Sequence, residues 1–404
     1  MSSALGLSTC VRRFFSQARE VLYDVPEAFR REYDYGTGMR RSAILSLTWR
    51  CTSHCQSCTA WRRPAQRARE LSVQEWLEVA AKLAASGVRS FELFGGDVLL
   101  RKEVLFPLCK AIHASGGEVH IATNCNLLDD EVARLFAETA YALYLSTDGL
   151  ESSHDTIRGT PGTFDRLAQA RQRLLTMRGA CPTPKLICNT TICQDNAAQA
   201  YDVAAYALKS GCDEIDFEYI GQFEDEHVQK SCIAGSLPSP IFMRSGPSRL
   251  LRAEQAPMLR EQLTRARELT GQPTLAGRPF RVVTLNIDVL ADHHLVDGTV
   301  PGKRCFVERA MVVVDPYGSV VPCLFFDNIC VGDVRQGALD RSLETTERRQ
   351  FRDFRDNGRL ELCRHCIMSV IRNRTGWDVL RRAYIQGGQP RAEESFHGSG
   401  RSAK

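Results

Sequence analysis

The chain has 404 residues, which is enough for a large hydrophobic core and two domains. Apolar residues make up 43% of the chain and charged residues 25%, which is the composition of an ordinary soluble globular protein. The formal net charge of +4 is too small to indicate nucleic-acid binding, and no apolar run is long enough to span a membrane. Sixteen cysteines without a signal peptide point to a reducing cytoplasm and metal–sulfur chemistry.

Residues 1–41 are predicted to form an N-terminal helical extension, with an amphipathic helix over Val11–Leu22. From Ser42 onward, strand-like and helix-like segments alternate. Strands are predicted over Ala43–Trp49, Phe91–Phe94, Val119–Thr123, Tyr141–Thr147, Lys185–Thr191 and Glu214–Ile220. Helices are predicted over Ser72–Ser86, Lys102–Ser115, Asp129–Glu138, Thr163–Arg178 and Ala197–Ser210, the first of them opened by a Ser72–Glu75 capping box. Six such repeats, within residues 42–223, imply a parallel sheet with helices outside it.

The pattern breaks in residues 224–304, which we expect to shape the substrate pocket and to complete the barrel. Glu224–Arg249 is rich in Gly, Pro and Ser and is predicted to be a long loop. A helix over Glu254–Leu269 and a strand over Arg281–Val289 follow. Residues 305–375 form a second, cysteine-bearing unit. Residues 376–404 are predicted to be the end of a helix and a polar, Gly-rich disordered tail.

Three cysteines follow the first predicted strand with C-x3-C-x2-C spacing: Cys51, Cys55 and Cys58. Three thiolates can bind three irons of a 4Fe–4S cluster, which leaves the fourth iron without a protein ligand. An open position on a metal centre is where chemistry occurs. The alternatives are a zinc site with His54 as fourth ligand, or disulfides, although zinc favours paired C-x2-C knuckles and nothing marks the chain as secreted.

This motif resembles the signature of the radical S-adenosylmethionine (radical SAM) superfamily. The resemblance implies an α/β fold, a partial (β/α)6 TIM-like barrel, whose first loop after a strand carries the cluster. It also implies S-adenosyl-L-methionine as a second cofactor, with its amino and carboxylate groups on the open iron. One-electron cleavage then gives a 5′-deoxyadenosyl radical that takes a hydrogen atom from the substrate.

Polar residues at four further strand ends match the family's cofactor-binding segments. Gly95, Gly96 and Asp97 stand where the family has Gly-Gly-Glu-Pro, so that Asp replaces Glu and Val98 replaces Pro. Arg158 and Ser146 resemble residues near the S-adenosylmethionine carboxylate and ribose, and an Arg fork suits a carboxylate. The segments around Thr123, Asp148 and Asn189 carry the rest of the resemblance. The cofactor-binding residues it implies are Gly95, Gly96, Asp97, Thr123, Asn124, Ser146, Asp148, Arg158, Asn189 and Thr190.

Two further cysteine pairs lie near the C-terminus: Cys305 and Cys323, with Gly318 between them, and Cys363 and Cys366. Their spacing resembles the SPASM/Twitch extension, and it implies a small C-terminal α+β cysteine-rich domain with one auxiliary 4Fe–4S cluster. A hairpin turning at Asp315–Gly318 is predicted to bring the first pair together. A structural zinc site of four thiolates is the alternative. Whether Cys330 is a further ligand stays open.

Most of the other cysteines are expected to be small buried hydrophobic residues. Cys125 and Cys193 differ because they lie just past strand ends, facing the expected substrate position. A thiol there can return a hydrogen atom to a substrate radical, as in radical epimerases. Cys125 and Cys193 are therefore our candidate catalytic residues.

The sequence leaves three functional hypotheses. The first is oxidation or epimerisation of a polar metabolite such as an aminocyclitol or sugar. The second is modification of a ribosomal peptide, and the third is a non-catalytic zinc-binding protein. The expected partners are a small-molecule or peptide substrate and an electron donor of the flavodoxin or ferredoxin type, with no nucleic acid and no membrane. A cytoplasmic location is expected.

Overall fold

The computed structural model describes residues 42–371, apart from 65, 303–304, 306 and 337–344. The predicted extension over residues 1–41 and the predicted tail over 376–404 lie outside the described residues. Within the described residues, no helix is both long and apolar enough to cross a membrane.

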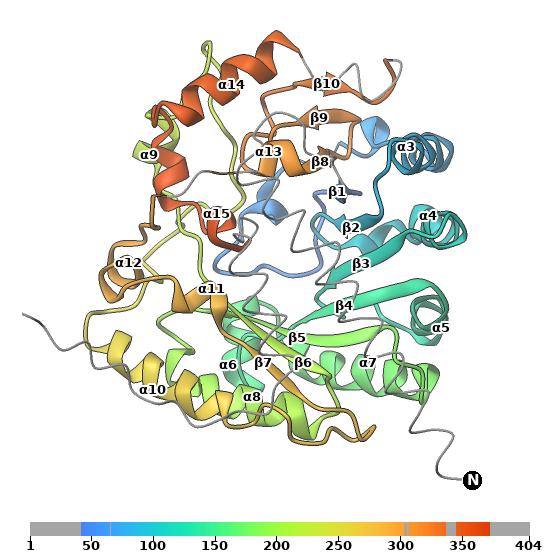
Figure 1. Cartoon of the computed structure of the whole chain (residues 1–404), viewed down its shortest axis with the longest axis vertical. Helices are drawn as coiled ribbons and strands as arrows, with labels where there is room; N and C mark the ends of the chain where they lie inside the picture. Colours follow the sequence, from blue (N-terminus) through green and yellow to red (C-terminus); the bar gives the residue numbers. More distant parts are fainter. Residues whose placement is uncertain (1–41, 65, 303–304, 306, 337–344, 372–404) are drawn as a thin grey trace, which may run out of the picture. The chain divides into compact units, whose positions relative to one another are not determined.

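Seven strands lie side by side and parallel, in sequence order, and form a curved sheet (Figure 1). They are β1 (Ser42–Ser46), β2 (Ser90–Phe94), β3 (Glu118–Thr123), β4 (Ala140–Ser146), β5 (Lys185–Ile192), β6 (Glu214–Tyr219) and β7 (Arg281–Val283). The first six are the predicted strands, with ends shifted by one to three residues. The sheet is the predicted partial TIM-like barrel, and β7 adds a seventh parallel strand to it.

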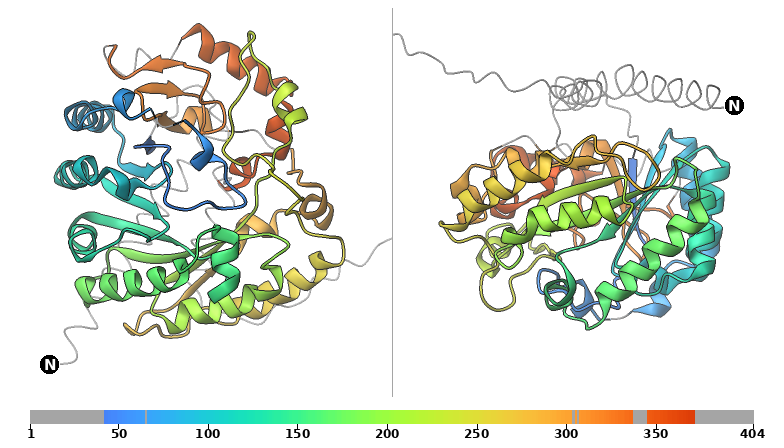
Figure 2. Two further views of the ribbon diagram at one scale, coloured as in Figure 1. Left: turned by 180° about the vertical axis from the view of Figure 1, so that it is seen from behind. Right: turned by 90° about the horizontal axis from the view of Figure 1, so that it is seen from below.

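Helices connect consecutive strands and lie outside the sheet, which buries the outer apolar face of each strand (Figure 2). They are α3 (Val73–Ala85), α4 (Lys102–Ala114), α5 (Asp130–Thr139), α6 (Glu151–Arg158), α7 (Thr163–Arg178), α8 (Ala200–Lys209) and α10 (Gln255–Arg267). The predicted capping box opens α3, because the Glu75 amide donates to Ser72 Oγ and Glu75 Oε2 accepts from the Ser72 amide.

The strand predicted over Arg281–Val289 is wrong in its second half. Only Arg281–Val283 pairs with β6, and α11 (Leu285–Asp288) follows at once. The Thr284 hydroxyl donates to the Asp288 carboxylate at 2.8 Å, and the Thr284 carbonyl accepts from the Asp288 amide. This local hydrogen bonding turns the backbone into a helix, which buries Ile287 completely in the core.

The linker that follows β6, residues 220–254, contains α9 (Asp225–Gln229). After α11 comes α12 (Asp292–Asp297). The predicted C-terminal hairpin is present as β8 (Met311–Val314) and β9 (Ser319–Val321). It is joined to the barrel, because β8 pairs in parallel with β1 and so continues the same sheet. The remaining elements are α13 (Val307–Ala310), β10 (Gly332–Asp333), α14 (Thr346–Asp356) and α15 (Met368–Ile371).

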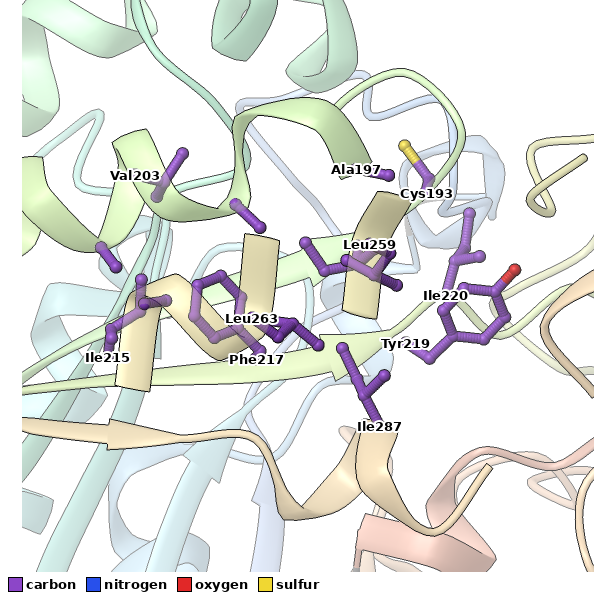
Figure 3. Close-up of a cluster of buried hydrophobic side chains, with 14 of the residues drawn as sticks. Cys193, Ala197, Val203, Ile215, Phe217, Tyr219, Ile220, Leu259, Leu263 and Ile287 are labelled. Atoms are coloured by element: carbon purple, nitrogen blue, oxygen red, sulfur yellow. The ribbon is translucent and has the colours of Figure 1, made fainter. Parts of the chain in front are cut away.

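A large apolar cluster between the sheet and its helices supports the end of the barrel (Figure 3). Phe217 of β6 is fully buried there, together with Leu259 and Leu263 of α10 and Ile215 of β6. Cys193 lies at the end of the same cluster. The packing of β5, β6 and α10 therefore fixes the position of the loop after β5.

We expect Phe217→Ala to lower the free energy of unfolding by about 3–5 kcal/mol, because the ring's apolar contacts are replaced by a cavity. Guanidinium unfolding followed by circular dichroism measures this. Leu275→Ala is the control, since Leu275 is 73% exposed and its truncation is expected to change stability by less than about 0.5 kcal/mol. Equal effects of the two substitutions would contradict the packing described here.

Candidate active site

The loop with the three motif cysteines follows β1 and is held against the turn that follows β2. The Gly96 amide donates to the Thr48 carbonyl at 2.7 Å, and the Asp97 amide donates to the Arg50 carbonyl at 2.8 Å. A Cβ atom at Gly95 would lie 2.3 Å from the Thr48 carbonyl oxygen, and one at Gly96 would lie 2.1 Å from that of Arg50. Glycine is therefore required at both positions by the close approach of two backbones.

Hydrogen-bond donors point at the sulfur atoms of this loop. The Ser53 amide lies 3.4 Å from Cys51 Sγ, and the Ala60 amide lies 3.4 Å from Cys58 Sγ. Burial is the main cause that raises the pKa of Cys51 to about 11 and that of Cys58 to about 12, and the neighbouring motif thiols add to the rise. Three sulfurs that share one loop and receive N–H donors fit the thiolate ligands of an iron–sulfur cluster.

Among the described residues, no group of three or more His, Cys, Asp or Glu side chains is arranged to hold a single metal ion. A 4Fe–4S cluster does not need such a group, because each of its thiolates binds a different iron.

Asp97 is buried at the end of β2 and is bound to its own turn. Its carboxylate accepts from the Leu99 amide at 3.0 Å and from the Thr52 hydroxyl of the cysteine loop. Burial, the largest influence, raises the pKa of Asp97 above its ordinary value. The side chain therefore ties the turn after β2 to the cysteine loop.

The end of β3 reaches the same loop. Asn124 Nδ2 lies 3.8 Å from Cys51 Sγ and 3.0 Å from Thr52 Oγ1. Thr123 Oγ1 accepts from the amide of Cys125, which is 1% exposed and has a φ of 65°. The structure thus brings Asn124 to the motif cysteines and buries the Cys125 side chain.

An ion pair joins the end of β4 to α6. Arg158 Nη2 lies 2.7 Å from Asp148 Oδ2, and Arg158 Nη1 lies 3.8 Å from Cys55 Sγ. Asp148 Oδ1 also accepts from the Thr191 amide at 2.9 Å. One guanidinium therefore links the cysteine loop to the ends of β4 and β5.

Several buried polar atoms at this edge have no hydrogen-bond partner within the described residues, among them Arg158 Nε and Asn189 Oδ1. Asn189 pairs in register with Ser146 of β4, so both side chains lie at the same strand edge. A buried donor and a buried acceptor left unpaired fit a ligand with polar groups of its own. Thr190 has the opposite orientation, since side chains alternate along a strand, and its hydroxyl lies 3.9 Å from Cys188 Sγ.

A small hollow, with room for about one water molecule, lies beside the cysteine loop. The residues that line it are Gln56, Ser57, Asp148, Ile157, Thr191, Cys193, Asp195, Ile220 and Arg249. A second hollow of similar size shares Gln56, Ser57, Ile220 and Arg249 with the first and is completed by the linker residues Gly221, Gln222, Phe242, Met243, Arg244, Ser245 and Pro247. Of the two thiols predicted to face substrate, Cys193 lines the first hollow and Cys125 lines neither.

The wall of the first hollow carries a thiol, a carboxylate and a guanidinium. Cys193 Sγ lies 3.8 Å from Asp195 Oδ2, and Asp195 forms an ion pair with Arg249. Burial, with a smaller contribution from Asp195, raises the pKa of Cys193 to about 12. The thiol therefore keeps its hydrogen at neutral pH.

The four C-terminal cysteines influence one another although about 60 residues separate the first from the last. Burial raises the pKa of Cys323 to about 12 and holds the pKa values of Cys363 and Cys366 well above their usual range. Cys305 and Cys323 also raise the pKa values of both Cys363 and Cys366, so the four thiols interact electrostatically. Cys330 is exposed, with its thiol 3.0 Å from the Gly332 carbonyl oxygen.

Sequence reasoning missed several residues of the site. Thr191 follows Asn189 by two positions and so lies on the same face of β5, a period that was available in the sequence. Asn126 Nδ2 binds Thr52 Oγ1 at 3.1 Å and Ser53 Oγ at 3.0 Å beside Asn124. No sequence signal pointed to Gln56, Asp195 or Arg249, because only the folded linker brings them together.

His154 supports the Asp148 turn in its neutral form. Its Nδ1 accepts from the Asp148 amide at 3.1 Å, and burial, followed by the nearby Arg158 charge, lowers its pKa from 6.5 to about 3. We expect stability to fall by about 1.4 kcal/mol per pH unit as the pH drops below about 6.5, because the unfolded chain binds a proton that the folded chain excludes.

Guanidinium unfolding of wild type and His154→Asn across this pH range measures the effect, since the variant lacks the titrating ring. His113→Asn is the control, because His113 is exposed. Parallel stability curves for wild type and His154→Asn below about pH 6.5 would contradict the assignment.

Comparison with known proteins gives separate matches for the barrel and for the C-terminal cysteine unit. Residues 45–177 match the family model of the radical SAM superfamily, and residues 305–367 match the SPASM model, an iron–sulfur cluster-binding domain. The sporulation killing factor maturation protein SkfB of Bacillus subtilis is 29% identical over 174 residues, which are 42% of this chain and 40% of SkfB. A GTP 3′,8-cyclase of Pseudomonas savastanoi is 35% identical over 128 residues, or 31% of this chain and 36% of the cyclase.

The chain thus covers less than half the length of either relative. Among solved structures, SuiB of Streptococcus suis bound to its precursor peptide SuiA superposes with a TM-score of 0.60 at 14% identity, over 87% of this chain and 77% of SuiB. At that identity the likeness shows the fold alone. The two domain matches imply 4Fe–4S clusters and S-adenosylmethionine as cofactors. The chain therefore carries a radical SAM domain over residues 45–177 and a SPASM domain over residues 305–367.

Proposed function

We propose that this chain takes a hydrogen atom from a C–H bond of a substrate held in the hollow beside the motif cysteines. When bound, the cluster and S-adenosylmethionine supply a radical able to do so. One observation carries the proposal: the cysteine loop, the Asp148–Arg158 ion pair and the hollow all meet at the edge where β1 to β5 end. In barrels of this kind, that edge is where active sites lie.

In this proposal, Cys51, Cys55 and Cys58 hold the first cluster. Asn124 and Arg158 direct N–H donors at two of these sulfurs. The proposed ligand-binding groups for S-adenosylmethionine are Gly95, Gly96, Asp97, Thr123, Asn124, Ser146, Asp148, Arg158 and Asn189. The prediction of Thr190 is not carried forward, because its side chain faces Cys188 on the other side of β5. The unpaired Arg158 Nε and Asn189 Oδ1 support this part of the proposal, since each is a buried polar atom that a ligand can satisfy.

Cys305, Cys323, Cys363 and Cys366 hold the auxiliary cluster. Four thiolates occupy every iron of a 4Fe–4S cluster, so a cluster of this kind moves electrons rather than binding substrate. The SPASM match supports iron over a structural zinc ion. An electron donor of the flavodoxin or ferredoxin type and a cytoplasmic location, where thiols stay reduced, complete the proposal.

For the substrate we propose a polar metabolite, such as an aminocyclitol or sugar, that is dehydrogenated or epimerised. The Asp195–Arg249 ion pair and Thr191 lie among the lining residues and offer hydrogen-bonding partners to such a substrate. Cys193 supports epimerisation, because a protonated thiol on this wall can return a hydrogen atom to a substrate radical.

A ribosomal peptide is the second candidate. It is favoured by the similarity to SkfB, a maturation protein, and to SuiB, which was solved with a precursor peptide. The second hollow, which opens along the linker, offers such a chain a place beside the first.

We expect anaerobically reconstituted wild type to bind about eight irons and a Cys51/Cys55/Cys58→Ala variant about four. Only wild type is expected to form 5′-deoxyadenosine from S-adenosylmethionine under reductant. Cys181→Ala is the control, since Cys181 is exposed and belongs to neither group. Iron in neither protein, or equal 5′-deoxyadenosine in both, would remove the proposed function.

The substrate class is tested by incubating wild type with metabolite and peptide fractions in D2O and following masses. Dehydrogenation removes two hydrogens from a metabolite, whereas epimerisation leaves the formula unchanged and adds one deuterium from the exchanged thiol. We expect Cys193→Ala to abolish deuterium uptake and Cys125→Ala to leave most of it, since only Cys193 lines the hollow. Uptake that survives in Cys193→Ala would eliminate this thiol as the donor.

A further inference from the structure

The linker after β6 forms one wall of the second hollow. It contacts both the loop with Cys51, Cys55 and Cys58 and the segment that follows Cys323. On one side, the Thr59 amide, next to Cys58, donates to the Ile241 carbonyl at 2.6 Å, and Arg62 Nη2 lies 3.1 Å from Ser245 Oγ. Ile241 precedes the lining residues Phe242 to Ser245. The first cysteine loop therefore holds the linker directly at the hollow.

The C-terminal cysteine unit holds the linker from the other side. The Phe325 ring, two residues after Cys323, packs against Phe223 and Phe242 with ring centroids 5.2 and 5.3 Å apart. Asn328 Nδ2 lies 3.3 Å from the Leu237 carbonyl oxygen. Two backbone hydrogen bonds join the start of the linker to its middle. The Phe223 amide donates to the Phe242 carbonyl and the Arg244 amide donates to the Phe223 carbonyl, both at 2.8 Å.

One side chain contacts all three segments. The guanidinium of Arg63 lies over the Trp49 ring, 4.4 Å from its centroid, and Trp49 stands two residues before Cys51. The same guanidinium donates to the Ser239 carbonyl of the linker and forms an ion pair with Asp327, four residues after Cys323. The side chains of Arg63 and Asp327 are 16% and 9% exposed, so this junction is largely shielded from water.

We propose that Arg63 is a positioning residue that fixes the linker wall of the substrate hollow between the two cysteine loops. The planar guanidinium can donate to a carbonyl and a carboxylate while it stacks on an indole, and a lysine ammonium cannot do all three. The C-terminal unit thereby shapes the substrate hollow in addition to holding its cluster. The role of the hollow rests on the proposed function, whereas the role of Arg63 in fixing the linker does not.

A second anchor explains why the linker stays attached without Arg63. Ser231 Oγ accepts from the Leu362 amide at 2.8 Å, and the rings of His227 and His365 stack with centroids 3.7 Å apart. These contacts hold the start of the linker on the segment around Cys363. Loss of Arg63 is therefore expected to loosen the part from Leu237 to Ser245 and not the whole chain.

Hydrogen exchange of the anaerobically reconstituted full chain tests the proposal at the Thr59, Phe223 and Arg244 amides. We expect Arg63→Met to speed their exchange by roughly tenfold or more, because local opening is governed by local contacts. Asp327→Asn is expected to act in the same direction, and the double variant to add little to the larger single effect. Arg63→Lys is expected to lie between wild type and Arg63→Met.

Arg67→Met is the matched control, since Arg67 is an exposed arginine in the same loop. The affinity for S-adenosylmethionine, measured by calorimetry, is expected to stay within about twofold of wild type in Arg63→Met, because that ligand is proposed to bind at the strand ends and not on the linker. Wild-type exchange at the three amides in both Arg63→Met and Asp327→Asn would overturn the proposal. The proposal would also be overturned if amide exchange rose equally throughout β4 and β5. Full additivity of the two single effects on exchange in the double variant would overturn it as well. Wild type that binds no S-adenosylmethionine would remove the proposed function, while the exchange rates would still decide the role of Arg63.

Discussion

The close approach of two backbones is the constraint on which the site depends. The loop with the motif cysteines has little regular structure, and it is fixed because the turn after β2 donates two amides to it. That approach leaves no room for a side chain at Gly95 or Gly96. Asp97 and Asn124 then complete the attachment through the Thr52 hydroxyl. The positions of the three thiols therefore follow in large part from contacts made by their neighbours in the loop.

Charge at the strand ends is organised around one buried arginine. Arg158 balances Asp148, which is 3% exposed, and also points a donor at Cys55. A buried carboxylate needs such a partner, since an uncompensated charge in this position costs several kcal/mol. The neutral His154 ring supports the same turn by accepting from the Asp148 amide. The site therefore pairs the charges of Asp148 and Arg158, while buried polar atoms such as Arg158 Nε and Asn189 Oδ1 have no partner within the described residues.

The sheet joins the two cysteine units mechanically. Because β8 pairs with β1, the strand that leads into the first cysteine loop is hydrogen-bonded to the hairpin that leads to Cys323. The linker adds a second connection through Phe325 and Arg63. The two cysteine units are therefore joined both through the sheet and through the linker.

Local sequence signals determined much of this protein. Alternating apolar strands and amphipathic helices, with caps such as Ser72, predicted six strands and their helices because those signals act within a few residues. The spacing of Cys51, Cys55 and Cys58 indicated cluster chemistry for the same reason, since one short loop supplies all three thiols. The strand predicted to Val289 failed because the apolar residues after Val283 fit a helix as well as a strand.

Only the tertiary structure decided which distant residues meet. Cys193 lines the first hollow and Cys125 lines neither, although both follow a strand end. Asp195 and Arg249 are 54 residues apart and carry no shared motif. The pairing of β8 with β1 and the triple contact of Arg63 are likewise long-range. Such contacts depend on the packing of whole elements, which no local pattern encodes, whereas capping, periodicity and motif spacing are written in neighbouring residues.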